Sequence, residues 1–123
     1  MGFTLTGNHI VAYRALTNVD EVFRALSDRS RRRLLDRLHD DNGQTLVQLS
    51  RNMEMSRQAV MKHLAILEDA NLVTSVKRGR ERLHYLNPVP IAEIYDRWIR
   101  KYERQRLEAL SNLKSALSGD VDE

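Results

Sequence analysis

The chain has 123 residues and a mass of 14.3 kDa, enough for one domain with one core but not for a catalytic or nucleotide-binding domain beside it. It contains no cysteine, so disulfides, thiolate metal sites and cysteine nucleophiles are excluded. The net charge is only +3, but 20 Lys and Arg against 17 Asp and Glu are unevenly spread, and the sequence pI is about 9.5. This balance predicts a local basic surface.

The sequence contains neither a membrane span nor a secretory signal. No apolar run approaches the roughly 20 residues that cross a bilayer. Residues 1–15 include polar side chains where a secretory signal would be apolar. We therefore expect a cytoplasmic protein with no membrane partner.

The first part of the chain predicts two helices. Residues 1–16 have weak periodicity and form either a flexible arm or a short helix. A first helix presents one apolar face, and a second begins at Ser27 or Asp28, either of which can cap it. An Asn-Gly turn ends the second helix. The inward side chains are Val19, Val22, Phe23 and Leu26 in the first helix and Leu34, Leu35 and Leu38 in the second.

Two more capped helices follow. Thr45 and Gln48 have the spacing of a capping box and begin a third helix, and Ser56 caps a fourth over residues 56–70 after a tight turn. Asn71 stands where the fourth helix should end in a left-handed residue. This arrangement predicts a helix-turn-helix. The inward side chains are Leu46, Leu49 and Met53 in the third helix and Val60, Leu64 and Leu67 in the fourth.

A basic hairpin comes next. Residues 72–77 and 81–86 are predicted to form two short strands around Gly79. Side chains alternate between the two faces of a strand, and we expect Leu83 and Tyr85, rather than Arg82 and His84, to pack inward. With the preceding helices, the hairpin predicts a mainly α fold with a small β-hairpin, the winged helix-turn-helix.

After two prolines, residues 91–117 are predicted to form one long helix, roughly 40 Å at about 1.5 Å per residue. It carries more apolar and aromatic surface than so small a core can cover, so we expect a partner. We assign residues 17–118 to a single domain and residues 119–123 to a flexible acidic tail. The apolar stripe of the long helix is Ile91, Ile94, Tyr95, Trp98, Tyr102, Ala109, Leu113 and Ala116.

The outward face of the fourth helix suits the edges of DNA bases. Arg57 can make a bidentate contact with guanine, Gln58 with adenine, and Met61 can lie against a thymine methyl group. Lys62 projects from the same face, and Ser56 with the amides of the first turn can hold a phosphate. The alternative is an amphipathic helix with a solvated face. The capped helix before it and the basic hairpin after it favour DNA binding.

The hairpin tip offers cations for the phosphate backbone or a narrow minor groove, from Arg78, Arg80 and Arg82 around Gly79. The alternative is a solvated edge strand, whose cations discourage pairing with strands of other molecules. The sequence does not decide the roles of two other groups of basic residues. His63 either bonds a phosphate or closes a contact between helices, and Arg31–Arg33 form either a solvated or salt-bridged face, which we favour, or a DNA contact.

These segments together resemble the ArsR family of bacterial transcriptional repressors, in residues 22–28, 31–35, 56–73, 78–80 and 85–88. The resemblance implies a homodimer, associated with the nucleoid, that represses by occupying a palindromic operator in double-stranded DNA. It implies a recognition helix over 56–70 with Ser56, Arg57, Gln58, Met61, Lys62 and His63, and a wing over 77–82 with Arg78, Arg80 and Arg82. It also implies a dimer interface made by the first and last helices, with Ile91, Ile94, Tyr95, Trp98, Tyr102, Val19 and Val22.

Three positions depart from the family pattern. Arg29 replaces a common proline, Glu54 replaces the glycine of the turn, and Asn71 replaces the glycine after the recognition helix. Either Glu54 is held in a strained conformation, at a cost of roughly 1 kcal/mol, or the turn is altered.

Metal-responsive relatives carry cysteines before the recognition helix, or histidines and carboxylates on the last helix. Here residues 45–49 offer no soft ligand, the last helix has no histidine, and the four histidines lack ligand spacing. We predict no cofactor and a place in the metal-independent branch, which includes small autorepressors.

The alternatives are a metal- or ligand-responsive repressor of the same fold, with an unknown effector, and a winged-helix protein-interaction module. The sequence also lacks a phosphate loop and a paired histidine and nucleophile, so an enzyme is not expected.

Overall fold

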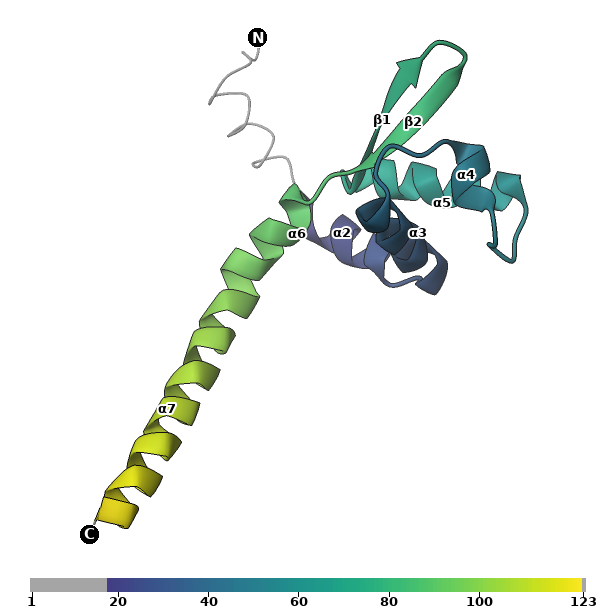
Figure 1. Cartoon of the computed structure of the whole chain (residues 1–123). Helices are drawn as coiled ribbons and strands as arrows, with labels where there is room; N and C mark the ends of the chain where they lie inside the picture. Colours follow the sequence, from purple (N-terminus) through teal and green to yellow (C-terminus); the bar gives the residue numbers. More distant parts are fainter. Residues whose placement is uncertain (1–17, 123) are drawn as a thin grey trace. The chain divides into compact units, whose positions relative to one another are not determined.

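The computed structural model describes residues 18–122 and divides into two units after Pro90, shown together in Figure 1. The predictions for residues 1–16 lie outside the described residues. The mainly helical fold with a two-stranded antiparallel hairpin is confirmed. Within residues 18–122, no helix combines the length and apolar character that a membrane span requires. The elements are α2 (Val19–Leu26), α3 (Arg29–Asp40), α4 (Leu46–Ser50), α5 (Arg57–Asp69), β1 (Val73–Arg78), β2 (Glu81–Leu86), α6 (Val89–Ile94), η1 (Tyr95–Ile99) and α7 (Arg100–Asp122).

Side-chain caps begin the helices of the first unit. Asp28, one of the two predicted caps of α3, accepts the Arg31 amide at 3.1 Å, and Ser56 Oγ accepts the Ala59 amide at 3.1 Å. Thr45 and Gln48 form the predicted capping box at α4. Each cap satisfies an amide that has no partner inside its own helix, so the chain fixes where these helices begin.

The core of the first unit is built from aliphatic side chains of α2 to α5 and the start of β1. On α2, the buried residues are Val22 and Ala25, whereas Phe23 is half exposed. The prediction that Phe23 points inward is therefore wrong. α2 lies against both α3 and α5, and its buried side includes the small Ala25, which is 1% exposed. The other fully buried side chains include Leu34, Leu38, Leu49, Val60, Leu64, Leu67 and Leu72.

The hairpin pairs Val73 with Leu86 at its base and Arg78 with Glu81 at its tip. Its second strand contradicts the predicted facing, because His84 is only 6% exposed while Leu83 and Tyr85 are half-buried. The physical reason is a bridge from a distant segment. The amide of His84 donates to the carbonyl oxygen of Gln44 at 2.8 Å, and His84 Nδ1 donates to the same oxygen at 3.1 Å.

Two asparagines adopt the left-handed conformation, Asn52 with a φ of 62° and Asn71 with a φ of 62°. Asn71 ends α5 as predicted. Glu54 is not among the residues with positive φ, so the turn is altered rather than strained at that position. Asparagine tolerates this conformation better than glutamate because its short polar side chain can bond locally.

The second unit, from Ile91, is one helical rod. It contains a π-helical turn, η1, between α6 and α7. Across that turn, the Tyr95 hydroxyl donates to Glu103 Oε2 at 2.6 Å, and this bond raises the pKa of Tyr95. α7 continues to Asp122, so residues 119–122 belong to this helix. A single glycine at position 119 costs only about 1 kcal/mol in a helix and does not end it.

Candidate nucleic-acid interface

Helix α5 presents a polar face to solvent and an apolar face to the core. Val60, Leu64 and Leu67 are buried, as the spacing predicted. The residues at the N-terminal end of the opposite face, Arg57, Gln58, Met61 and Lys62, are all exposed, Met61 by 54%. These side chains project from the folded body, where they can reach an external molecule.

Arg37 fixes the turn that precedes α5. From α3, its guanidinium donates to the carbonyl oxygens of Gln48 at 2.9 Å and Leu49 at 2.8 Å, and also to that of Arg51. α4 has only 5 residues, so its last carbonyls have no partners within the helix. Arg37 supplies these partners and charge-assisted bonds that complement the helix dipole. We had not predicted this role, because Arg37 lies on what the sequence presents as a solvated face.

The neighbouring arginines have similar roles. Arg31 donates to the carbonyl oxygen of Ala25 at 2.7 Å, and Arg32 donates to that of Leu26 at 2.7 Å, at the end of α2. Arg33 donates to Asn52 O at 3.1 Å, on the far side of the turn. These guanidiniums bind backbone carbonyls within the unit, and Arg32 and Arg33 are also exposed, as expected for the solvated face that we favoured.

His63 connects α5 to the start of α3. Its Nδ1 lies 3.3 Å from Arg31 Nη1 and 4.0 Å from Asp28 Oδ2. Arginine has only donors, so Nδ1 accepts and the proton of the neutral ring sits on Nε2. The pKa of Asp28 is lowered chiefly by the hydrogen bond from the Arg31 amide; burial of the carboxylate opposes this, and the charge of Arg31 lowers the pKa further. Of the two roles left open for His63, the helix contact is present in the structure.

The arginines of the wing differ in whether another side chain holds them. Arg82 Nη1 donates to Ser75 Oγ at 3.0 Å across the hairpin, and Ser75 Oγ donates to Glu68 Oε1 on α5 at 3.2 Å. This chain of bonds ties the wing to α5. Arg78 and Arg80 lie exposed at the tip beside Gly79, whose φ of +65° makes the turn. Both are therefore accessible to a phosphate backbone.

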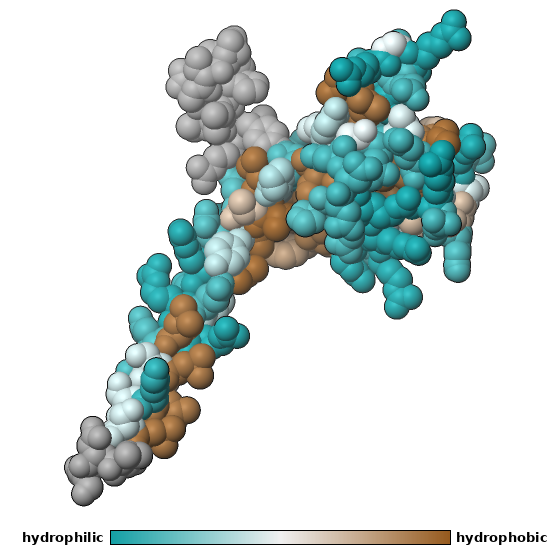
Figure 2. Space-filling view, in the orientation of Figure 1, coloured by the Kyte–Doolittle hydropathy of each residue, from teal (hydrophilic) through white to brown (hydrophobic). Residues whose placement is uncertain are grey.

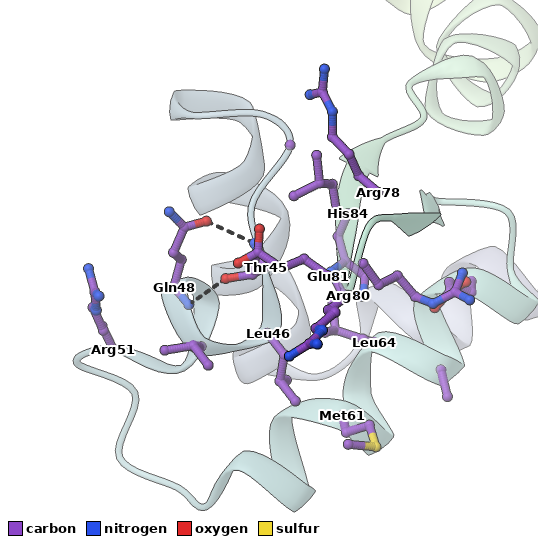
Figure 3. Close-up of a pocket in the computed structure, with 16 residues that line it drawn as sticks. Thr45, Leu46, Gln48, Arg51, Met61, Leu64, Arg78, Arg80, Glu81 and His84 are labelled. Atoms are coloured by element: carbon purple, nitrogen blue, oxygen red, sulfur yellow. Dashed lines mark hydrogen bonds between the residues drawn. The ribbon is translucent and has the colours of Figure 1, made fainter. Parts of the chain in front are cut away.

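A groove of about 950 Å³ lies between α4, α5 and the wing (Figure 3). Its apolar lining includes Leu46, Met61 and Leu64. Its charged lining is mostly cationic, although Glu68 and Glu81 also contribute. The arginines of the groove are Arg51, Arg78, Arg80 and Arg82. Figure 2 shows hydrophilic surface over much of the first unit, including the hairpin tip. A cationic groove beside an exposed helix is suited to a polyanion.

The residues predicted for a dimer interface fall into two groups. Val22 is fully buried within the subunit, so the prediction that its side chain contacts a partner is wrong. Ile94 is also buried, and Val19 is half-buried. The exposed members are Ile91, Tyr95, Trp98 and Tyr102. Ile99, Leu107, Leu110 and Leu117, which were not in the predicted set, are exposed as well. Figure 2 shows hydrophobic surface along the rod.

No group of three or more histidine or carboxylate side chains in residues 18–122 is placed to hold a metal ion. Among the described residues, His39 and His63 each approach one carboxylate within 4.0 Å, Asp40 and Asp28 respectively. His84 is buried against the Gln44 carbonyl. The described histidines are therefore dispersed among separate structural contacts.

Comparison with known proteins agrees with this geometry. A family described as "Helix-turn-helix domain" matches residues 26–76. The chain is 40% identical over 88 residues to YuzN of Bacillus subtilis, an uncharacterised HTH-type transcriptional regulator, covering 67% of this chain and 96% of YuzN. It is 36% identical over 76 residues to the HTH-type transcriptional regulator Rv2034 of Mycobacterium tuberculosis, covering 61% of this chain and 69% of that protein.

Solved structures give the same result. An ArsR-like transcriptional regulator from Rhodococcus sp. RHA1 has a TM-score of 0.59 and 34% identity, covering 77% of this chain and 91% of its own. The ArsR family transcriptional regulator RHA00566 has a TM-score of 0.61 and 30% identity, covering 74% and 90%. These relatives are regulators rather than enzymes. The chain belongs to the ArsR family of winged helix-turn-helix transcriptional regulators.

Proposed function

We propose that this protein is a homodimeric repressor that binds an inverted-repeat operator in double-stranded DNA. The observation that carries this proposal is the exposed row of Arg57, Gln58, Met61 and Lys62 on α5, directly beside an arginine-lined groove. An α-helix fits the major groove of B-DNA, where arginine reads guanine and glutamine reads adenine. The row therefore specifies sequence, and the groove supplies the positive charge that binding needs.

The groove accounts for how α5 and the wing act on one duplex. With α5 in the major groove and the wing at the adjacent minor groove, the strand between them runs past Arg51, Arg78 and Arg80. The amides at the start of α5 can hold a phosphate there, and Ser56 Oγ, which accepts the Ala59 amide, can still donate its hydroxyl hydrogen to that phosphate. Arg82 is held by Ser75, so it orients the wing as well as adding charge.

Two copies related by a two-fold axis would place their recognition helices in successive major grooves, about 34 Å apart. This symmetry is why we propose an inverted repeat, occupied on the nucleoid in the cytoplasm. The chain binds its operator without a metal in this proposal, and the DNA upstream of its own coding region is the first candidate operator.

A footprint of the full chain on that upstream DNA, with and without a chelator, tests the proposal. We expect protection of two half-sites that a chelator leaves unchanged. Protection lost on chelation would establish a metal-responsive repressor instead. If affinity for duplex DNA is absent, the protein-interaction module would take its place.

Two variants sharpen this experiment. Gln58→Ala should change the preferred base at one position of each half-site, with a loss of about 1–3 kcal/mol in discrimination. Gln105→Ala, at an exposed position on α7, is the matched control and should leave the footprint unchanged. If the two variants behave alike, α5 does not read the DNA sequence.

A further inference from the structure

The two strands of the hairpin are held at the same level by different segments of the first unit. On β2, the amide of His84 donates to the carbonyl oxygen of Gln44, just before α4, at 2.8 Å. Ser75, the cross-strand partner of His84 on β1, donates its hydroxyl hydrogen to Glu68 Oε1 on α5 at 3.2 Å. Glu68 therefore fixes the strand of the hairpin that packs against α5.

The side chain of Arg82 continues this connection toward the tip. Arg82 Nη1 donates to Ser75 Oγ at 3.0 Å, from a position diagonally across the hairpin. The Ser75 hydroxyl has one hydrogen, which goes to the Glu68 carboxylate, and its lone pairs remain for Arg82. The cation at one end and the anion at the other strengthen both bonds. The three side chains form one chain of hydrogen bonds from α5 to the wing.

The hairpin depends on such a connection because its tip lies far from its base. Figure 1 shows β1 and β2 extending away from the helices of the first unit. Since a strand rises about 3.3 Å per residue, Gly79 lies roughly 20 Å from Val73, and a swing of about 10° at the base would move the tip by about 3 Å. A hydrogen bond to a phosphate does not survive such a displacement. An isolated two-stranded hairpin has little stability, so bonds to neighbouring elements determine where the tip lies.

The charge of Glu68 is the opposite of what a groove for DNA requires. Glu68 lines the groove together with Arg78 and Arg80, and a carboxylate in this place repels phosphate. By charge alone, replacing Glu68 should strengthen DNA binding. The hydrogen bond to Ser75 predicts the reverse, because its loss releases the hairpin. The two effects have opposite signs, so one variant can distinguish them.

We propose that Glu68 is a positioning residue for the wing. Through Ser75 and Arg82 it holds the hairpin at the angle at which the tip meets the minor groove, beside the major groove that α5 occupies. This inference rests on the proposed function and adds a residue that acts on DNA through other side chains. Its loss should therefore affect the contacts of the wing and leave the base contacts of α5 intact.

Footprinting of the full chain at saturating concentration, on a labelled duplex that contains the protected site, separates these two contacts. Hydroxyl radicals report on the deoxyriboses of the minor groove, and dimethyl sulfate reports on guanine N7 in the major groove. We expect Glu68→Ala and Ser75→Ala to lose the minor-groove protection by the wing and to keep the guanine protection by α5. Loss of this connection should raise the dissociation constant roughly tenfold. Unchanged or higher affinity of Glu68→Ala, with the wing region still protected, would overturn the proposal.

Conservative variants separate the hydrogen bond from the charge. Glu68→Gln removes the charge but retains an oxygen that accepts the Ser75 hydroxyl, and Ser75→Thr retains the hydroxyl. Both should keep the minor-groove protection. Asp69→Ala is the matched control, because it removes the same charge from an exposed neighbour that lies outside the groove lining, and it should keep the protection too. A loss in Asp69→Ala as large as that in Glu68→Ala would overturn the proposal.

A double variant tests the route from α5 to the wing. Glu68→Ala combined with Ser75→Ala should bind no more weakly than either single variant, because both changes remove the same connection. Additive losses would overturn the route through Ser75. Circular dichroism and melting temperatures check that each variant remains folded, which we expect because neither side chain belongs to the buried core.

The same experiments separate this inference from the proposed function. If the natural chain does not protect duplex DNA, the proposed function and the positioning role are both lost. If the natural chain protects two half-sites, and the minor-groove protection is unchanged in Glu68→Ala and Ser75→Ala, the proposed function is retained and only the positioning role is lost.

Discussion

Leucines in the two units have opposite environments. Leu64 in the first unit is 2% exposed, while Leu113 in the second is 57% exposed, although both lie on amphipathic helices. The first unit packs its helices around a shared core, whereas the second is a single rod with its leucine row open. The difference indicates that the first unit carries its own stability, and the homodimer that we propose would cover the leucine row of the second.

The largest effect should come from truncating these two leucines. Leu64→Ala leaves a cavity in the core and should lower the free energy of unfolding by about 2–5 kcal/mol, as measured by urea denaturation. Leu113→Ala should leave folding of the first unit unchanged and weaken dimerisation in sedimentation equilibrium. Equal losses of unfolding free energy in both variants would remove the distinction between the units.

Arg37 gives the next largest effect, since the first unit depends on contacts between distant segments. Arg37→Met removes bonds to the carbonyl oxygens of Gln48, Leu49 and Arg51. We expect a loss of about 1.5–3 kcal/mol in unfolding free energy, together with weaker DNA binding as the turn before α5 loosens. Arg33→Met, which removes one exposed bond to Asn52, is the control and should cost less.

A smaller, pH-dependent effect should come from Asp28. Its pKa is lowered from 3.8, so the folded state favours the carboxylate. The stabilisation is present above pH 3.8 and is lost as the pH falls through the lower folded-state value. Asp28→Ala should cost about 1 kcal/mol at neutral pH, and the difference from the natural chain should shrink in acid. A constant difference across that range would rule out the carboxylate cap.

The smallest effect concerns the turn before α5. Asn52 is in the left-handed conformation and Glu54 is not. Asn52→Gly should therefore be neutral or stabilise the first unit by up to about 1 kcal/mol, whereas Glu54→Gly should destabilise it slightly through backbone entropy. Thermal unfolding of both variants measures the difference. The reverse order of melting temperatures would place the strain at Glu54 after all.

Features that depend on neighbouring residues were predictable from the sequence. The caps at Asp28, Thr45 and Ser56 and the buried face of α5 follow from spacings of three or four residues. The exposure of Arg57, Gln58, Met61 and Lys62 follows from that face. Local sequence patterns therefore specified helix α5 and its outward side chains.

Features that depend on distant segments were not predictable in this way. His84 is buried because Gln44, far away in sequence, bridges to it, and strand alternation alone does not contain that bridge. Arg31 and Arg37 looked like surface charges because their carbonyl partners lie on other helices. The π turn lacks a proline or glycine to mark it, so the sequence predicted one uninterrupted helix over residues 91–117.

The claim that the first unit binds DNA through α5 and the wing is tested most directly by the salt dependence of affinity. With a labelled duplex containing the footprinted site, log affinity should fall steeply with log salt concentration. Arg78→Ala should weaken binding to all sequences and reduce the slope by about one, while Arg104→Ala on α7 should change neither. Binding that is insensitive to salt, or an Arg78→Ala slope equal to that of the natural chain, would contradict the account.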